Sequence, residues 1–224
     1  MTGEPPTMPD CKLDVTGSPV IRSTAWFGEL CGRRFGCLLI DPPWKYDNES
    51  PPCLPEKQPE TCVVEYYYPT MGLDEIKAMP VKDVAEKDSV LFLWATCPML
   101  PEAIEVMKAW GWKYKTIVTW EKTNGDCMGY WFRTCTEHLL VGVRGDVKSF
   151  RSMTRNLIQC NRGRHSAKPQ QAHDIIESVT PDANRLEIFA RLHRPGWTAW
   201  GNQVERDLYS PNTELSGGAK TKDV

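Results

Sequence analysis

The feature that most constrains this chain is an apolar run that ends in two consecutive prolines. Residues 37–46 read Cys-Leu-Leu-Ile-Asp-Pro-Pro-Trp-Lys-Tyr. A short apolar stretch that meets Pro-Pro predicts a buried strand that stops at the prolines. Neither proline has an N–H, and Pro43 favours an extended conformation at Pro42. The turn therefore presents the Asp41 carboxylate and a main-chain carbonyl as acceptors, with few donors competing for them.

Two aromatic residues, Trp44 and Tyr46, follow these acceptors. An exocyclic amine on a planar base needs two acceptors for its two N–H bonds and an aromatic face for its ring. Holding both N–H bonds in this way would draw the nitrogen toward a pyramidal shape and free its lone pair to attack a methyl group. The alternative is that Asp-Pro-Pro only makes a turn and that Trp44 fills the core. These residues alone do not decide between the two interpretations.

Composition favours one sizeable domain over residues 21–209. The 224 residues are 41% hydrophobic, and the segments 1–20 and 210–224 are rich in polar and turn-forming residues, which predicts poorly ordered tails. No apolar run has the length of a membrane span, and the N-terminus has no signal pattern. Nine cysteines without a C-x-x-C pair and four histidines without ligand spacing argue against a metal site. We therefore expect a reduced, intracellular protein.

A locally basic stretch stands out in a chain whose formal net charge is −2. The window from 144 to 168 holds a single acid, Asp146, against seven basic residues: Arg144, Lys148, Arg151, Arg155, Arg162, Arg164 and Lys168. Such a window is either a solvated loop or a phosphate-binding arm for nucleic acid. Because of its neighbours, we interpret it as the arm, with Arg151, Arg155, Arg162 and Arg164 as candidate substrate contacts.

The remaining pattern alternates strands with helices, which predicts an α/β sheet, mostly parallel, with a helix on each face. The residues 47–70 form a long proline-rich loop of the kind that often acts as a lid. Asp41 is placed at the carboxyl end of a strand, where such sheets bind their ligands. The expected helices cover 73–79, 98–110 and 169–179, and the expected further strands cover 89–96, 114–120, 137–143, 185–191 and 198–201.

Nine short strings resemble, in order, the MT-A70 family of adenine-N6 methyltransferases, and most closely its short bacterial and phage-type members. The resemblance covers roughly residues 35–205. The strings are Leu-Ile-Asp-Pro-Pro-Trp (39–44), Tyr-Pro-Thr-Met (68–71), Leu-Phe-Leu-Trp (91–94), Trp-Gly-Trp-Lys-Tyr-Lys-Thr (110–116), Gly-Tyr-Trp-Phe-Arg (129–133), Glu-His-Leu-Leu-Val-Gly-Val-Arg-Gly (137–145), Ser-Ala-Lys-Pro (166–169), Leu-Glu-Ile-Phe-Ala-Arg (186–191) and Trp-Gly-Asn-Gln (200–203).

The resemblance implies a Rossmann-like S-adenosylmethionine-dependent fold in permuted order, with the catalytic Asp41-Pro42-Pro43-Trp44 loop before the cofactor-binding strands. Asp41 and Pro42 would accept the amine hydrogens, and Trp44 or Tyr46 would stack on the base. Glu137 would border the target base. The cofactor would be held by Lys168 at its carboxylate and, at its ribose and neighbouring groups, by Arg191, His193, Asn202 and Gln203. Taken singly, these residues could equally be solvated strand ends and loop residues.

The resemblance leaves the substrate and the partners open. We expect methyl transfer to the N6 amine of adenine in DNA, because the short single-domain form is similar to the bacterial and phage-type members. The same reaction on RNA, a catalytically inactive nucleic-acid-binding partner subunit and a small-molecule amine methyltransferase are the alternatives. An inactive subunit would lose the catalytic acid, whereas Asp41 is present here. A homodimer and a heteromeric assembly are both compatible with the sequence.

Overall fold

The computed structural model describes Phe27, Leu30 and the residues 32–46, 70–124, 131–163 and 167–201. The two expected tails and nearly all of the expected lid at 47–70 lie outside these residues. So do three of the expected site residues, Arg164, Asn202 and Gln203.

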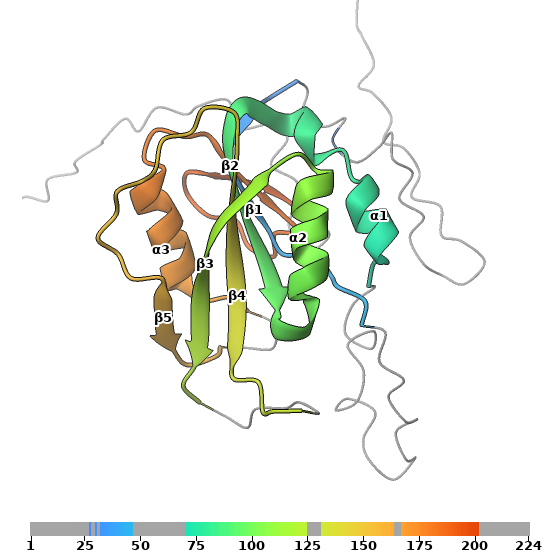
Figure 1. Ribbon diagram of the computed structural model, residues 1–224. Coiled ribbons are helices and arrows are strands. Elements are labelled where there is room, and N and C mark those ends of the chain that lie inside the picture. Colours follow the sequence, from blue (N-terminus) through green and yellow to red (C-terminus); the bar gives the residue numbers. More distant parts are fainter. Residues whose placement is uncertain are drawn as a thin grey trace, which may run out of the picture.

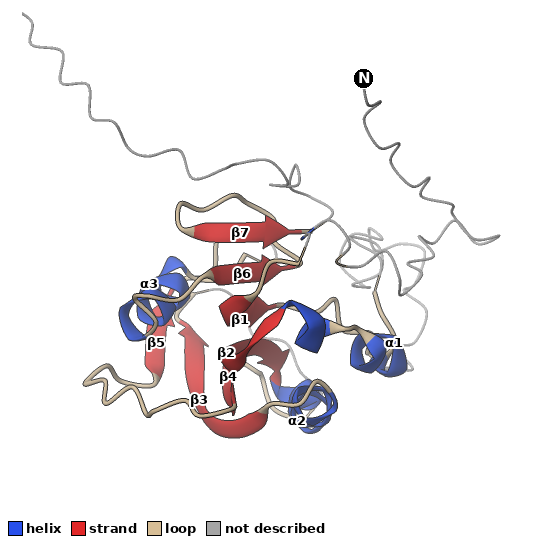
Figure 2. Ribbon diagram, turned by 90° about the horizontal axis from the view of Figure 1, so that it is seen from above, coloured by secondary structure: helices blue, strands red, loops and turns tan. Residues whose placement is uncertain are grey.

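Seven strands form one mixed sheet (Figure 1), and Figure 2 shows their order, β5-β3-β4-β2-β1-β6-β7. Strand β4 is antiparallel to its neighbours β2 and β3, and every other neighbouring pair is parallel. The prediction of a mostly parallel α/β sheet is therefore confirmed. The strands are β1 (Phe35–Ile40), β2 (Ala85–Thr96), β3 (Lys113–Lys122), β4 (Thr136–Arg144), β5 (Leu157–Cys160), β6 (Arg185–Ile188) and β7 (Trp197–Trp200).

Helices cover both faces of this sheet (Figure 2). Side chains of α1 (Leu73–Ala78) and α2 (Leu100–Ala109) pack with one face, and those of α3 (Gln170–Val179) pack with the other. Short 3-10 turns, Val81–Val84 and Cys97–Met99, precede β2 and α2. Each face has a core of its own because successive strand residues point to opposite faces. Within the described residues, no helix is long and apolar enough to cross a membrane.

The observed elements differ from the expected ones by more than two residues in three places. Strand β2 begins at Ala85, four residues early, and extends the sheet beyond its apolar run. Strand β6 ends at Ile188 because Phe189 has a φ of 63°, which no strand residue adopts. Strand β5 lies within the stretch that we expected to be an uninterrupted loop, and it pairs with β3.

The cysteines also differ from expectation at one position. Cys37, Cys97 and Cys160 carry free thiols, as expected for a reduced protein. Cys135 is disulfide-bonded, so the prediction of fully reduced cysteines is wrong there.

Candidate active site

Four charged or polar side chains meet at one edge of the sheet, on the face that α3 covers. Trp94, Leu139 and Trp120 belong to the core beneath α3. Because side chains alternate along a strand, Thr96, Glu137 and Lys122, each two residues from one of these, point to the same face. In the ladder, Glu137 lies opposite Thr96 and Trp120. Asp41 follows directly after β1, at the same edge.

Two lysines bind the two carboxylates of this edge, and one of them, Lys168, bridges both. Lys168 Nζ lies 2.8 Å from Asp41 Oδ2 and 3.2 Å from Glu137 Oε2. The other oxygen of Glu137, Oε1, lies 2.5 Å from Lys122 Nζ. Charges therefore alternate in the order Lys122, Glu137, Lys168, Asp41. The resemblance implied that Lys168 meets the cofactor carboxylate, and in the structure its ammonium group contacts Asp41 and Glu137.

Lys168 reaches this position because it lies just before α3, where Pro169 is the N-cap. Its ammonium group lies over the Trp94 ring, 5.4 Å from the ring centroid. Its side chain is 18% exposed, and the Asp41 side chain is 26% exposed. Charges this far from bulk water need partners, and each of these has one.

The same geometry sets the pKa values of the cluster. Burial raises the pKa of Asp41, while the Lys168 ammonium group and Arg191 oppose the rise. Burial would also raise the pKa of Glu137, but Lys168 and Lys122 outweigh it, and the net shift is downward. Burial would lower the pKa of Lys168, but Asp41 and Glu137 outweigh it, and that pKa is raised. Lys168 is therefore charged throughout the neutral range.

The turn after β1 is fixed by main-chain hydrogen bonds. The Trp44 N–H donates to the Pro42 carbonyl at 2.8 Å, and the Met71 N–H donates to the Pro43 carbonyl at 2.8 Å. The Lys45 N–H donates in turn to the Met71 carbonyl at 3.2 Å. A donor thus does compete for the Pro42 carbonyl. A carbonyl oxygen has two lone pairs, so one acceptor position remains at Pro42.

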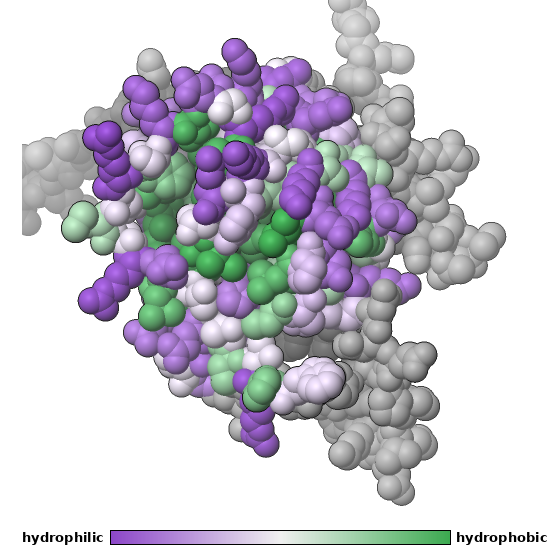
Figure 3. Space-filling view, viewed as in Figure 1, coloured by the Kyte–Doolittle hydropathy of each residue, from purple (hydrophilic) through white to green (hydrophobic). Residues whose placement is uncertain are grey.

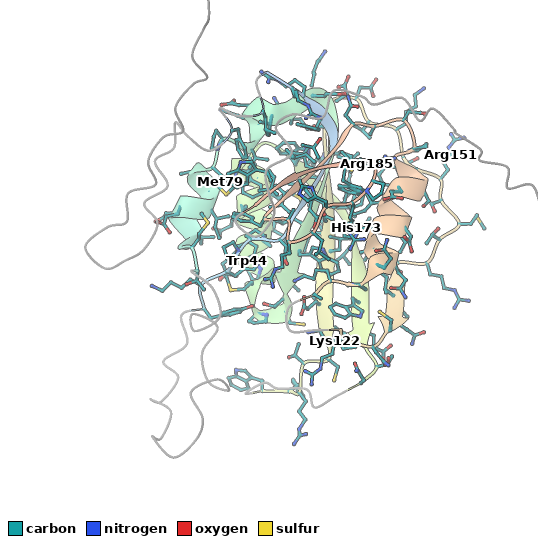
Figure 4. All side chains as sticks on the ribbon, turned by 180° about the vertical axis from the view of Figure 1, so that it is seen from behind. Trp44, Met79, Lys122, Arg151, His173 and Arg185 are labelled. Carbon is teal, nitrogen blue, oxygen red and sulfur yellow. The ribbon has the colours of Figure 1, made fainter. Side chains whose placement is uncertain are left out.

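The two aromatic residues of the turn have different surroundings. Trp44 is 5% exposed and belongs to the core under α1 and α2 (Figure 4), so the interpretation that it fills the core holds. It therefore presents no open face to a base. Tyr46 is only partly buried, and its hydroxyl lies 3.0 Å from Thr96 Oγ1. Of the two aromatic residues expected to stack on a base, the structure leaves Tyr46 in a position to do so.

Besides Lys168, the expected cofactor residues of the described part, Arg191 and His193, lie on the loop between β6 and β7. This loop begins at the same edge of the sheet as Asp41, since β6 is parallel to β1. Arg191 is half-buried and near enough to Asp41 to lower its pKa, whereas His193 is exposed. Arg194 donates to the side chain of Gln170 at the start of α3, next to Lys168. The loop and the start of α3 thus form one side of the site.

The basic stretch does not act as one arm in this structure. Strand β5 divides it, and the two parts lie at opposite edges of the sheet. Arg151 and Arg155 precede β5, at the edge away from Asp41, and both are exposed. Figure 4 shows Arg151 far from Lys122, and Figure 3 shows hydrophilic side chains along the edge where β4 ends. Arg162 follows β5 and is also exposed, at the edge of Asp41.

Contacts between loops confirm the position of Arg162. Its main-chain N–H donates to Asn124 Oδ1 at 2.6 Å, so the segment after β5 lies beside the segment after β3. Of the four arginines expected to contact substrate, Arg162 is the one that the described residues bring to the edge of Asp41.

Several residues at this edge were not identified from the sequence. Thr96 is the last residue of an expected strand and Lys122 lies two residues past another, and only the ladder register brings them to the site. Trp131 and Phe132 are 94% and 85% exposed. They lie six and five residues before Glu137, within about 20 Å of it by chain length. Their signal was the string Gly-Tyr-Trp-Phe-Arg, in which three consecutive aromatic residues stand outside any expected strand or helix.

The mixed seven-stranded sheet with helices on both faces has the α/β architecture of a Rossmann-like methyltransferase. The MT-A70 family model matches residues 35–203. The chain therefore belongs to the MT-A70 family of S-adenosylmethionine-dependent N6-adenosine methyltransferases, as the resemblance predicted.

Relatives of two lengths share this similarity. The Type II methyltransferase M.MunI of Mycoplasma sp is 30% identical over 190 residues, which cover 80% of this chain and 81% of the relative. The N(6)-adenosine-methyltransferase MT-A70-like of Arabidopsis thaliana is 30% identical over 179 residues, or 76% of this chain and 24% of the relative. The N(6)-adenosine-methyltransferase catalytic subunit METTL3 of Homo sapiens is 28% identical over 182 residues, which cover 77% of this chain and 28% of the relative.

Proposed function

We propose that this protein transfers the methyl group of S-adenosylmethionine to the exocyclic N6 amine of adenine in DNA. One observation carries the proposal: the Asp41 carboxylate is held by Lys168 at the carboxyl end of β1, beside a carbonyl with a remaining acceptor position and a partly buried tyrosine. This is the set of groups that an aromatic amine needs in order to become a nucleophile.

Asp41 and Pro42 would act on the amine. The nitrogen of adenine N6 is a poor nucleophile because the ring shares its lone pair. Two acceptors, one on each N–H, favour the pyramidal nitrogen of the transition state more than the planar one of the ground state. The negative charge of Asp41 also stabilises the positive charge that builds on the nitrogen in the transition state. Tyr46, fixed to Thr96 through its hydroxyl, offers the ring face for the base.

The residues present fit S-adenosylmethionine. When bound, it supplies an electrophilic methyl group on a sulfonium. The Lys168 ammonium group has three N–H donors, of which Asp41 and Glu137 take two, so one remains for the carboxylate of the cofactor. Arg191 and His193 lie on the adjoining loop, where they would contact the ribose and neighbouring groups. Asn202 and Gln203 are proposed for the same role from the family resemblance.

The choice of DNA rests on the relatives. The similarity to the Type II methyltransferase M.MunI extends over most of both chains, and this favours the substrate expected for the short bacterial members of the family. The chain spans about a quarter of the N(6)-adenosine-methyltransferases that it matches. The sequence also contains no zinc-finger spacing and no RNP-type aromatic motif. RNA is the second candidate, because the same residues at this edge would act on the N6 amine of adenine in RNA as well as in DNA.

Nucleic acid would approach along the edge that carries Arg162, Trp131 and Phe132. Exposed aromatic rings stack on bases of any sequence, and each stacked base contributes about 1–3 kcal/mol. Arginine supplies the charge that attracts the phosphates. Exposed basic and aromatic side chains would thus flank the edge of Asp41, as binding of a strand around an extruded base requires.

The test compares matched DNA and RNA oligonucleotides of one sequence under single-turnover conditions, with nucleoside analysis of the product. We expect N6-methyladenine in DNA, formed faster in single-stranded or mismatched DNA because unstacking is costly in a perfect duplex. Asp41→Ala serves as the inactive control. A clear preference for the RNA strand would replace DNA by RNA in the proposal, and no transfer to adenine in any strand would overturn it.

A further inference from the structure

We propose that Lys122 is a positioning residue for the methyl-transfer site: by holding the outer oxygen of Glu137, it leaves the Lys168 ammonium group directed at Asp41. The inference deepens the proposed function and rests on it, because the purpose of the arrangement is to set the charge on Asp41. Lys122 does not touch Asp41, so any effect it has must pass through Glu137 and Lys168.

The distances show a division of partners within the cluster. Glu137 Oε1 is bound by Lys122 at 2.5 Å, whereas its Oε2 lies 3.2 Å from Lys168. Lys168 is closer to Asp41, at 2.8 Å. Each carboxylate thus has one near lysine. Without Lys122, the Glu137 side chain, which is 15% exposed, would have Lys168 alone, and that single ammonium group would serve two carboxylates.

The position of Lys122 is fixed from two sides. It is the last residue of β3, and its main-chain N–H donates to the Cys135 carbonyl at 2.8 Å. Its ammonium group lies 5.2 Å from the centroid of the Trp120 ring. Trp120 is the ladder partner of Glu137, so this cation–π contact aims Lys122 along the sheet at the carboxylate. The lysine is therefore preorganised for Glu137 and not merely nearby on the surface.

Removal of Lys122 has a defined electrostatic consequence. The charged groups that act on Asp41 are Lys168, Glu137 and Arg191. Those that act on Glu137 are Lys122 and Lys168, and the imidazole of the neighbouring His138 also interacts with it. Loss of the Lys122 ammonium group leaves the charge of Glu137 less compensated and draws Lys168 away from Asp41. Both changes make the Asp41 carboxylate harder to ionise.

The experiment is a carbon-13 NMR titration of the Asp41 carboxyl group, assigned by its loss in Asp41→Asn. The variants are Lys122→Met, Lys122→Arg, Glu137→Gln and the double variant Lys122→Met with Glu137→Gln. Lys115→Met, at an exposed lysine of the same strand, is the matched control. Lys122→Gln replaces Lys122→Met if the latter does not fold.

We expect Lys122→Met to raise the Asp41 midpoint by roughly half a pH unit, as one charge at this range does. Lys122→Arg should restore it, and Lys115→Met should leave it unchanged. In the Glu137→Gln background, Lys122→Met should have little further effect, because the residue through which it acts is gone. An unchanged midpoint in Lys122→Met, or an equal shift in both backgrounds, would overturn the inference.

Activity gives a second measurement. In single-turnover methylation, Lys122→Met should reduce the transfer rate and shift the acidic limb of the pH–rate profile to higher pH. The affinity for nucleic acid should change little. If the wild-type protein methylates no adenine, the proposed function fails, and the NMR titration still decides the role of Lys122. If methylation occurs and the titration midpoint of Asp41 is the same in the wild type and in Lys122→Met, only the positioning role of Lys122 fails.

Discussion

The indole N–H of Trp44 donates to the main-chain carbonyl of Trp94 at 3.0 Å. This bond fastens the turn that follows β1 to the end of β2, the neighbouring strand. Because the Trp44 ring is also packed in the core, the turn cannot move without disturbing the core. Trp44 therefore acts on the site as a support for Asp41, and its burial explains why the turn holds one shape.

The first prediction concerns that bond. Trp44→Phe keeps an aromatic ring in the core but removes the N–H, so we expect the free energy of unfolding to fall by about 1–3 kcal/mol. The transfer rate should fall as well, because Asp41 is less firmly placed. Denaturant unfolding and single-turnover assays measure the two effects. Trp131→Phe, at an exposed position, is the control for the unfolding measurement alone, and equal stability in both variants would contradict the prediction.

The second prediction concerns the charge of Asp41. Asp41→Ala should abolish methyl transfer while leaving the fold intact. Asp41→Asn should also be badly impaired, because the amide loses the negative charge and replaces one acceptor oxygen with a donor. Single-turnover rates and circular dichroism check both. Near-normal turnover in Asp41→Asn would show that the amine is not activated in the way proposed.

The third prediction concerns the pH dependence of transfer. Asp41 must be ionised to accept from the amine, and burial raises its pKa, so the rate should fall on the acidic side at a higher pH than for an exposed aspartate. The Lys168 ammonium group lowers the pKa of Asp41, so Lys168→Met should shift the acidic limb of the pH–rate profile to still higher pH. Glu137 raises the pKa of Asp41, so Glu137→Gln should shift that limb to lower pH. Shifts of one sign in both variants would contradict this account.

A companion measurement separates the roles of Lys168. Calorimetric titration with S-adenosylmethionine should show weaker binding for Lys168→Ala than for Asp41→Ala, because Lys168 is proposed to bind the cofactor carboxylate and Asp41 the target amine. Equal binding by the wild type and Lys168→Ala would remove Lys168 from the cofactor site.

The fourth prediction concerns the divided basic stretch. Removing a side chain that binds one phosphate should reduce the slope of log affinity against log salt by roughly 0.7–0.9. Arg162→Ala should therefore flatten the slope for a short strand bound at the edge of Asp41. The pair Arg151→Ala and Arg155→Ala lies at the opposite edge and should flatten it, by about one to two units, only for DNA long enough to reach there. A flatter slope for a short strand in the Arg151→Ala and Arg155→Ala variant would contradict the assignment of these arginines to the opposite edge of the sheet.

The sequence determined the parts of the fold that depend on local chemistry. The two prolines after β1 end the strand whatever surrounds them, and the apolar spacing of α2 and α3 depends on the helix alone. Strand β5 was missed because its four residues, Leu157–Cys160, alternate weakly between polar flanks and are stabilised by pairing with β3. Long-range pairing is not encoded in a short window of sequence.

In the candidate site, too, the residues were predictable from the sequence where local chemistry marks them, and their contacts across the fold were not. Asp41 and Lys168 were both identified, but their contact was not, because it depends on the start of α3 lying over the end of β1. Lys122 was missed altogether, since its role comes from the register that places Trp120 opposite Glu137. Arg151 and Arg162 belong to one basic run in the sequence, and only β5 between them carries them to opposite edges.

The last prediction concerns the close approach of the β6–β7 loop to the end of β7. A Cβ at Gly201 would lie 2.3 Å from the Ala190 carbonyl oxygen, and the main chain of Ala190 would have to move. A Cβ at Gly142 would lie 2.6 Å from Met107 Sδ, but that side chain is flexible and can turn aside. The two glycines therefore form a matched pair, one against main chain and one against a side chain.

We expect Gly201→Ala to lower the free energy of unfolding by about 1–3 kcal/mol, and Gly142→Ala to lower it by less. Because Ala190 precedes Arg191, the displaced main chain should also move that arginine and weaken binding of S-adenosylmethionine. Denaturant unfolding and calorimetric titration of both variants measure the two effects. Cofactor affinity reduced equally in both variants would mean that general destabilisation causes the loss. Affinity reduced in Gly201→Ala alone would tie Arg191 to the cofactor site through the position of its loop.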